Sequence, residues 1–101
     1  MEEVIRVSEN IKNILIKHTR KKTVEESLNE ILRNEITRKK KIYMIKVKHF
    51  ESKYKSDFMQ FETSQKGKDM AYELEKNYFD WDMAVTAVED LEEELRLLES
   101  R

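Results

Sequence analysis

The chain has 101 residues, of which 41% are charged, and it contains one glycine, no proline and no cysteine. The absence of cysteine excludes a disulfide framework and a zinc site built from thiolates. No apolar run approaches the roughly 20 residues that span a bilayer, and the first residues lack the features of a signal peptide. We therefore expect a cytoplasmic protein without membrane contact.

The composition favours helix, and the charges divide unevenly along the chain. A sequence rich in Glu, Lys and Leu and free of proline favours helix over nearly its whole length. Residues 1–55 carry 15 Lys or Arg and 8 Asp or Glu, a net charge of +7, whereas residues 56–101 carry 5 and 13, a net charge of −8. One half could bind an anionic partner, or the halves could be solvated or neutralise each other in an oligomer.

Residues 3–7 allow two interpretations. The β-branched alternation of EVIRV, followed by Ser8 as a helix start signal, favours a short strand. In that strand Ile5 and Val7 would share one face. The apolar residues from Val4 to Ile14 are also spaced 3, 4 and 3, which is typical of a helix.

Two helices with predicted caps follow. Residues 9–20 are predicted to form the first, whose apolar face contains Ile11, Ile14, Leu15 and His18. Residues 20–23 (RKKT) form a connector. Thr23 and Glu26 have the spacing of a capping box, so we expect the second helix to begin at Val24.

The second helix has no predicted breaker before Tyr54. Its apolar stripe continues through the basic segment 38–41 to Tyr43, Val47 and Phe50. A helix of about 30 residues would be roughly 45 Å long. Such a helix needs a partner, most simply a second copy, so we expect a homo-oligomer, a dimer or higher.

The remaining residues predict a short helix, a loop and a last helix. Ser56 is the expected cap of the short helix SDFMQFE. Residues 63–69, which contain Gly67, form the clearest loop. The last helix is expected from about 69 to 99, with leucines lining one side of an acidic tail.

No pattern predicts catalysis. The chain has no phosphate loop, no glycine-rich dinucleotide turn and no H-E-x-x-H motif. His18 and His49 are the only histidines, and neither belongs to a recognisable ligand set. We expect a protein that is not an enzyme and that uses no cofactor and no metal.

Aromatic residues gather between 54 and 81. The set predicts a small core that contains Phe58, Phe61 and Trp81. Aromatic side chains also anchor many protein interfaces. We therefore assign Tyr78, Phe79 and Trp81 to a candidate partner surface. Because Tyr78 and Phe79 are adjacent, one of them should remain available to a partner.

Residues 3–36 resemble a ribbon-helix-helix module, the Arc- and MetJ-like class of DNA-binding proteins. The matching segments are EVIRVSE, ENIKNILIKH and TVEESLNEIL. The resemblance implies a homodimer whose paired strands enter the major groove. Glu2, Val4 and Arg6 would face the groove, and Thr23 would lie where backbone amides hold a phosphate. The other candidate phosphate contacts are basic residues: Lys21, Lys22, Arg38, Lys39 and Lys40.

Small antitoxins often combine such a module with an extended C-terminal arm that masks a toxin. We therefore expect a mainly α protein with a module at residues 1–36 and a helical interaction arm at 37–101. Its expected function is that of an antitoxin-like autorepressor, whose acidic arm binds a basic toxin. The alternative is an all-α bundle or coiled-coil oligomer without a nucleic-acid role, in which residues 2–20 form one helix.

Overall fold

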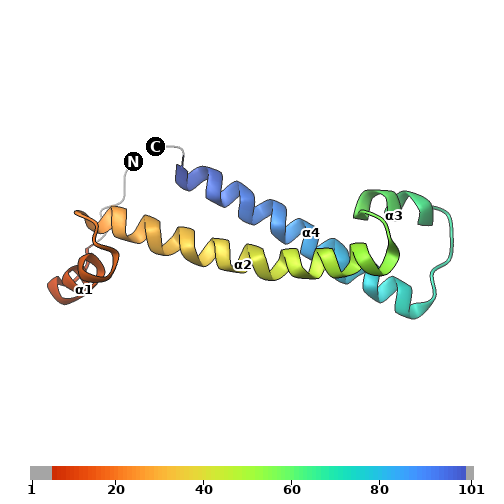
Figure 1. Ribbon diagram of the computed structural model, residues 1–101, viewed down its shortest axis with the longest axis horizontal. Coiled ribbons are helices and arrows are strands. Elements are labelled where there is room, and N and C mark those ends of the chain that lie inside the picture. The colour runs from red at the N-terminus through yellow and green to blue at the C-terminus, as the bar shows by residue number, and fades with distance from the viewer. Residues whose placement is uncertain (1–5, 100–101) are drawn as a thin grey trace. The chain divides into compact units, whose positions relative to one another are not determined.

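The computed structural model describes residues 6–99, which fold into helices joined by short connectors (Figure 1). The helices are α1 (Glu9–Thr19), α2 (Val24–Tyr54), α3 (Phe58–Gln65) and α4 (Tyr72–Glu99). The chain divides into two compact units between Glu35 and Ile36, within α2. The sequence prediction placed this boundary one residue later.

The mainly helical fold is confirmed, but no strand is present between residues 6 and 99. Of the strand predicted at 3–7, Arg6 and Val7 lie in neither a strand nor a helix, and residues 3–5 lie outside the described part. A strand needs a neighbour for its hydrogen bonds, and these helices offer none. The single helix over residues 2–20 is also wrong, because α1 begins at Glu9.

Both caps predicted in the first unit are confirmed. The Ser8 side chain accepts a hydrogen bond from the amide of Ile11 at 3.2 Å, and the Thr23 hydroxyl accepts one from the amide of Glu26 at 3.1 Å. Each hydroxyl satisfies an amide that the first helical turn leaves without a partner. Arg20 ends α1 in the left-handed region, with φ of 57°.

A hydrogen bond between side chains joins the two helices of this unit. The hydroxyls of Thr19 and Ser27 lie 2.7 Å apart, and the Thr19 hydroxyl also donates to the carbonyl of Leu15 at 2.7 Å. Ser27 is completely buried. The contact between α1 and α2 therefore contains a hydrogen-bonded pair of hydroxyls.

In the second unit, α2 and α4 form an antiparallel hairpin (Figure 1). Phe50 stacks on Trp81 at 5.7 Å between ring centroids, and the Asn77 amide donates to the Tyr54 hydroxyl at 2.8 Å. Farther along, Lys40 pairs with Glu92 at 3.9 Å. From one of these contacts to the next, the residue numbers fall on α2 and rise on α4, so the two helices are antiparallel.

The hairpin follows a heptad-like pattern, as expected for helices that pack side by side over several turns. The α2 positions that face α4 are spaced alternately by 4 and 3 residues, and the α4 positions that face α2 are spaced by 3 and 4. The α2 residues in this stripe, all buried or half-buried, are Ile36, Lys40, Tyr43, Val47, Phe50 and Tyr54. The long helix to Tyr54 is therefore confirmed, and α4 of the same chain packs against its second half.

An aromatic core closes the end of the hairpin near α3. Phe50, Phe61 and Trp81 are buried there, and Tyr54, Phe58 and Tyr78 pack against them. Trp81 stands between Phe50 on α2 and Phe61 on α3, with ring centroids 5.7 and 5.2 Å away. The predicted core residues Phe58, Phe61 and Trp81 are therefore confirmed.

The connectors differ in detail from the prediction. Asp57, and not Ser56, caps α3, because its carboxylate accepts from the amide of Gln60 at 2.8 Å. Lys55, which follows α2, has a left-handed backbone with φ of 50°. The loop begins after Gln65, and α4 starts at Tyr72. Gly67 has φ of 76°, a conformation that glycine adopts readily.

Candidate functional site

The first unit has no apolar core of its own. Among residues 6–35 the only buried residue is Ser27. Four large apolar side chains of α1 and the start of α2 are between 42% and 57% exposed: Ile11, Ile14, Ile31 and Leu32. A unit of 35 residues lies below the roughly 40 residues that usually fold without additional support. We call these four exposed side chains together the open apolar face.

Basic side chains surround the connector of this unit. Arg20, Lys21 and Lys22 are all exposed, and Thr23 caps the helix that follows. The first turn of α2 carries the partial positive charge of a helix N-terminus. Glu25 and Glu26 lie in that same turn, so Lys21 and Lys22 must provide most of the attraction for an anion.

The predicted groove-facing residues are only partly described. Arg6 is exposed, and it precedes the extended Ser8, whose ψ is 156°. Glu2 and Val4 lie outside the described residues. The structure therefore describes one of the three predicted groove-facing residues, Arg6, and its side chain is open to solvent.

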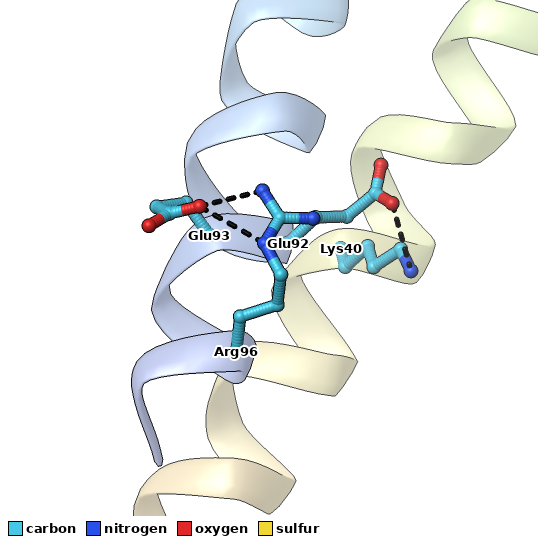
Figure 2. A network of polar contacts seen from close by, with 4 residues as sticks. All are labelled: Lys40, Glu92, Glu93 and Arg96. Carbon is cyan, nitrogen blue, oxygen red and sulfur yellow. Dashed lines mark hydrogen bonds and ion pairs between the residues drawn. The ribbon is translucent and has the colours of Figure 1, made fainter. Parts of the chain in front are cut away.

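The basic segment of α2 belongs to the second unit, and its three candidate phosphate contacts differ in exposure. Arg38 and Lys39 are exposed, whereas Lys40 is half-buried. Figure 2 shows Lys40 pointing toward Glu92 on α4, at the 3.9 Å of their ion pair. On the same stretch of α4, Arg96 donates to Glu93 at 2.9 and 2.6 Å. A phosphate contact by Lys40 would compete with its pairing in the hairpin.

The three aromatic residues assigned to a partner surface have different environments. Trp81 is 0% exposed, so its side chain belongs to the core and is not available at the surface. Tyr78 is half-buried, and its hydroxyl donates to Glu62 at 2.5 Å. Phe79 is 56% exposed. Of the adjacent pair, Phe79 is therefore the more available residue.

Glu62 also controls the ionisation of Tyr78. The hydrogen bond to the Glu62 carboxylate raises the pKa of Tyr78 above its usual value, and burial of the ring and the nearby negative charges act in the same direction. The hydroxyl therefore remains a donor, and it fixes the ring at the junction of α3 and α4.

A pocket beside Phe79 was not predicted. It has a volume of about 460 Å³ and is lined by residues of the α3–α4 connector and of α4: Lys68, Asp69, Met70, Glu75, Tyr78 and Phe79. The sequence predicted only a loop in this connector. The residue spacing of α4 could have indicated this region, because Tyr72, Phe79 and Met83 recur at intervals of 7 and 4.

Two classes of site are absent from the described residues. Between residues 6 and 99 no three His, Asp or Glu side chains gather where they could hold a metal ion. No helix in that range is both long and apolar enough to cross a membrane. Comparisons with protein-family models, curated proteins and solved structures found no match to this chain.

Proposed function

We propose that this protein is a homodimeric, antitoxin-like DNA-binding autorepressor that acts in the cytoplasm, and that its α2–α4 hairpin binds a partner protein. The observation that carries the proposal is the open apolar face of the first unit. A second copy would bury Ile11 and Ile14 of α1 against the same face of its partner. Fully burying an aliphatic side chain contributes about 1.5–3 kcal/mol.

The dimer would also provide a partner for a strand at residues 3–7. A strand from each copy would pair with the other into an antiparallel ribbon, as in the ribbon-helix-helix proteins that this sequence resembles. The described residues support this arrangement in one respect: Arg6 and Val7 are not helical, and Ser8, which caps α1, has an extended backbone. The chain therefore enters the first unit in a conformation compatible with a strand.

The DNA surface would combine two kinds of contact. Lys21 and Lys22, exposed at the connector, would bind phosphates, and the α2 N-terminus would hold one phosphate near Thr23. Arg6 on the ribbon would read a base edge, as Arg does by bidentate hydrogen bonds to guanine. Phosphate contacts position the protein, and the base contact provides sequence preference.

A DNA titration with the Arg6→Ala variant tests this function. The substitution should weaken binding to the DNA upstream of the protein's own reading frame by a factor equivalent to about 1–3 kcal/mol. Binding to a random duplex should remain close to that of the parent. Lys48→Ala, which removes an exposed charge from the second unit, is the matched control and should affect both duplexes equally.

The alternative function is that of a helical interaction protein without a nucleic-acid role. The observation in its favour is that residues 6–99 contain helices and no strand. It also predicts a dimer through the open apolar face. The parent protein distinguishes the two functions, because failure to bind either duplex at low salt would exclude the DNA-binding function and leave the alternative.

A further inference from the structure

Helix α4 has a second apolar stripe, directed away from the core. Tyr72, Phe79 and Met83 are between 56% and 83% exposed. At about 100° per residue, their spacings of 7 and 4 place them on one line along the helix. Trp81 and Val88, which are buried, lie on roughly the opposite side. The stripe formed by Tyr72, Phe79 and Met83, which we call the outer stripe, is therefore not part of the hairpin core.

Acidic side chains border the outer stripe. Helix α4 carries ten Asp or Glu and two Lys or Arg, a net charge of −8. By the same helical spacing, Glu75 and Asp82 lie on one side of the stripe and Asp80 on the other. Lys76, beside Asp80, is the one basic side chain of α4 along the stripe. A surface with an apolar centre and a mostly acidic rim favours a partner with an apolar centre and a basic rim.

The pocket beside Phe79 continues this surface at its N-terminal end. Met70, Tyr78 and Phe79 give the pocket apolar walls, and Asp69 and Glu75 add two carboxylates against one amine, Lys68. A volume of about 460 Å³ can accept a long side chain. A Lys or Arg would lay its aliphatic stem along the apolar wall and place its charge near the carboxylates.

Another copy of this chain fits the outer stripe poorly. Two α4 surfaces would bring their acidic rims together. The basic outer side of α2, where Ile42 and Ile45 are exposed, has complementary charge. However, it lies on the opposite side of the hairpin from the outer stripe. If the outer stripe of one copy bound the basic side of α2 in another copy, each end of the assembly would still expose one of these two surfaces. Such head-to-tail contacts therefore produce open chains.

We propose that the outer stripe and the pocket beside Phe79 bind a basic amphipathic helix of a different protein, with a Lys or Arg side chain entering the pocket. This inference rests on the partner-binding part of the proposed function and is independent of its DNA-binding part. The partner is defined by its chemistry: apolar residues along one side of a helix, flanked by positive charge.

The test uses the full chain and two synthetic helical peptides with the same leucine stripe, one flanked by Lys and Arg and the other by Glu. Binding is measured by fluorescence anisotropy of the labelled peptides at physiological salt, because salt screens weak surface attraction. The basic peptide should bind, and the acidic peptide should bind at least tenfold more weakly. Equal affinity for both peptides would overturn the proposal.

Paired substitutions locate the binding surface. Phe79→Ala with Met83→Ala should weaken binding of the basic peptide at least tenfold, and Glu75→Lys should also weaken it. The matched control is Ile42→Ala with Ile45→Ala, which removes equally exposed apolar side chains from α2 and should leave the affinity unchanged. Equal losses in the two double variants would show adsorption without a defined site and would overturn the proposal.

Two further measurements separate failure of this inference from other failures. Trp81 is the single tryptophan and is fully buried, so unchanged emission confirms that a variant retains the hairpin. The Phe79 and Met83 double variant should bind DNA as the parent does. If it instead loses self-association in sedimentation, the stripe is a contact between copies and the inference is wrong.

Discussion

Thr23 shows how one side chain sets the start of an element. Its hydroxyl accepts from the amide of Glu26, and α2 begins at the next residue. The sequence predicted this cap because T-x-x-E is a local pattern with few competing interpretations. It placed the cap of α3 one residue early, at Ser56, because Ser56 and Asp57 are adjacent and both residue types cap well. In the structure the Asp57 carboxylate makes the capping bond, and the Ser56 hydroxyl donates to the carbonyl of Asp57.

Replacing Thr23 by alanine should therefore destabilise the first unit. The expected loss is about 1 kcal/mol, the typical contribution of an N-cap hydroxyl. Circular dichroism at fixed protein concentration should show a lower thermal midpoint. Thr86→Ala, an exposed threonine inside α4, is the control and should not lower the midpoint, because alanine is the better helix former. Equal midpoints for parent and Thr23→Ala would contradict the assignment of Thr23 as the cap.

Tyr78 should make stability fall at high pH. Its pKa is raised above the usual value of 10.0, mainly by the hydrogen bond to Glu62. The folded state therefore holds the phenolic proton more tightly than the unfolded state does. This stabilisation is complete below pH 10 and is lost as the pH rises through the raised pKa. Urea unfolding of the parent and of Tyr78→Phe, followed between pH 8 and 11, should show a steeper alkaline loss in the parent.

At the scale of elements, the pairing of α2 with α4 explains most of the charge asymmetry. The part of α2 from residue 36 to 54 carries seven Lys or Arg and one Glu, and α4 has a net charge of −8. The boundary that the charges suggested, after residue 55, therefore divides the hairpin and does not separate the two units. Periodicity predicted the long helix, but a stripe of apolar residues does not identify the helix that covers it.

Two phenylalanines in the hairpin should respond differently to truncation. Phe50 is 6% exposed in the aromatic core, so Phe50→Ala should reduce the free energy of unfolding by about 3–5 kcal/mol. Phe79 lies at the surface, and Phe79→Ala should change the free energy of unfolding by no more than about 0.5 kcal/mol. Urea titrations followed by Trp81 emission provide both values. Similar losses for the two variants would mean that Phe79 also belongs to the core.

At the scale of the whole molecule, the two units differ in what stabilises them. The second unit buries Phe50, Phe61 and Trp81 within one chain. The first unit buries only Ser27 among its described residues. Sequence patterns predicted the helices of both units equally well, but they could not distinguish an apolar face covered by the same chain from one left open. That distinction depends on contacts between residues far apart in the sequence.

The two units should consequently unfold with different concentration dependence. Far-ultraviolet circular dichroism reports both units, whereas Trp81 emission reports the second unit alone. If association stabilises the first unit, a tenfold increase in protein concentration should move the early part of the thermal circular dichroism transition to higher temperature. The Trp81 transition should move less. Coincident transitions at every concentration would indicate that the chain unfolds as one cooperative unit.

Sedimentation equilibrium of the full chain and of Ile14→Asp tests whether the open apolar face forms a dimer. The parent should be a dimer at micromolar concentration, and Ile14→Asp should be a monomer, because the dimer would bury an unpaired carboxylate in the apolar contact. Ile45→Asp places the same charge on an exposed residue of the second unit and should remain a dimer. A parent that is a stable monomer, or an Ile14→Asp variant that dimerises as the parent does, would exclude a dimer through this face.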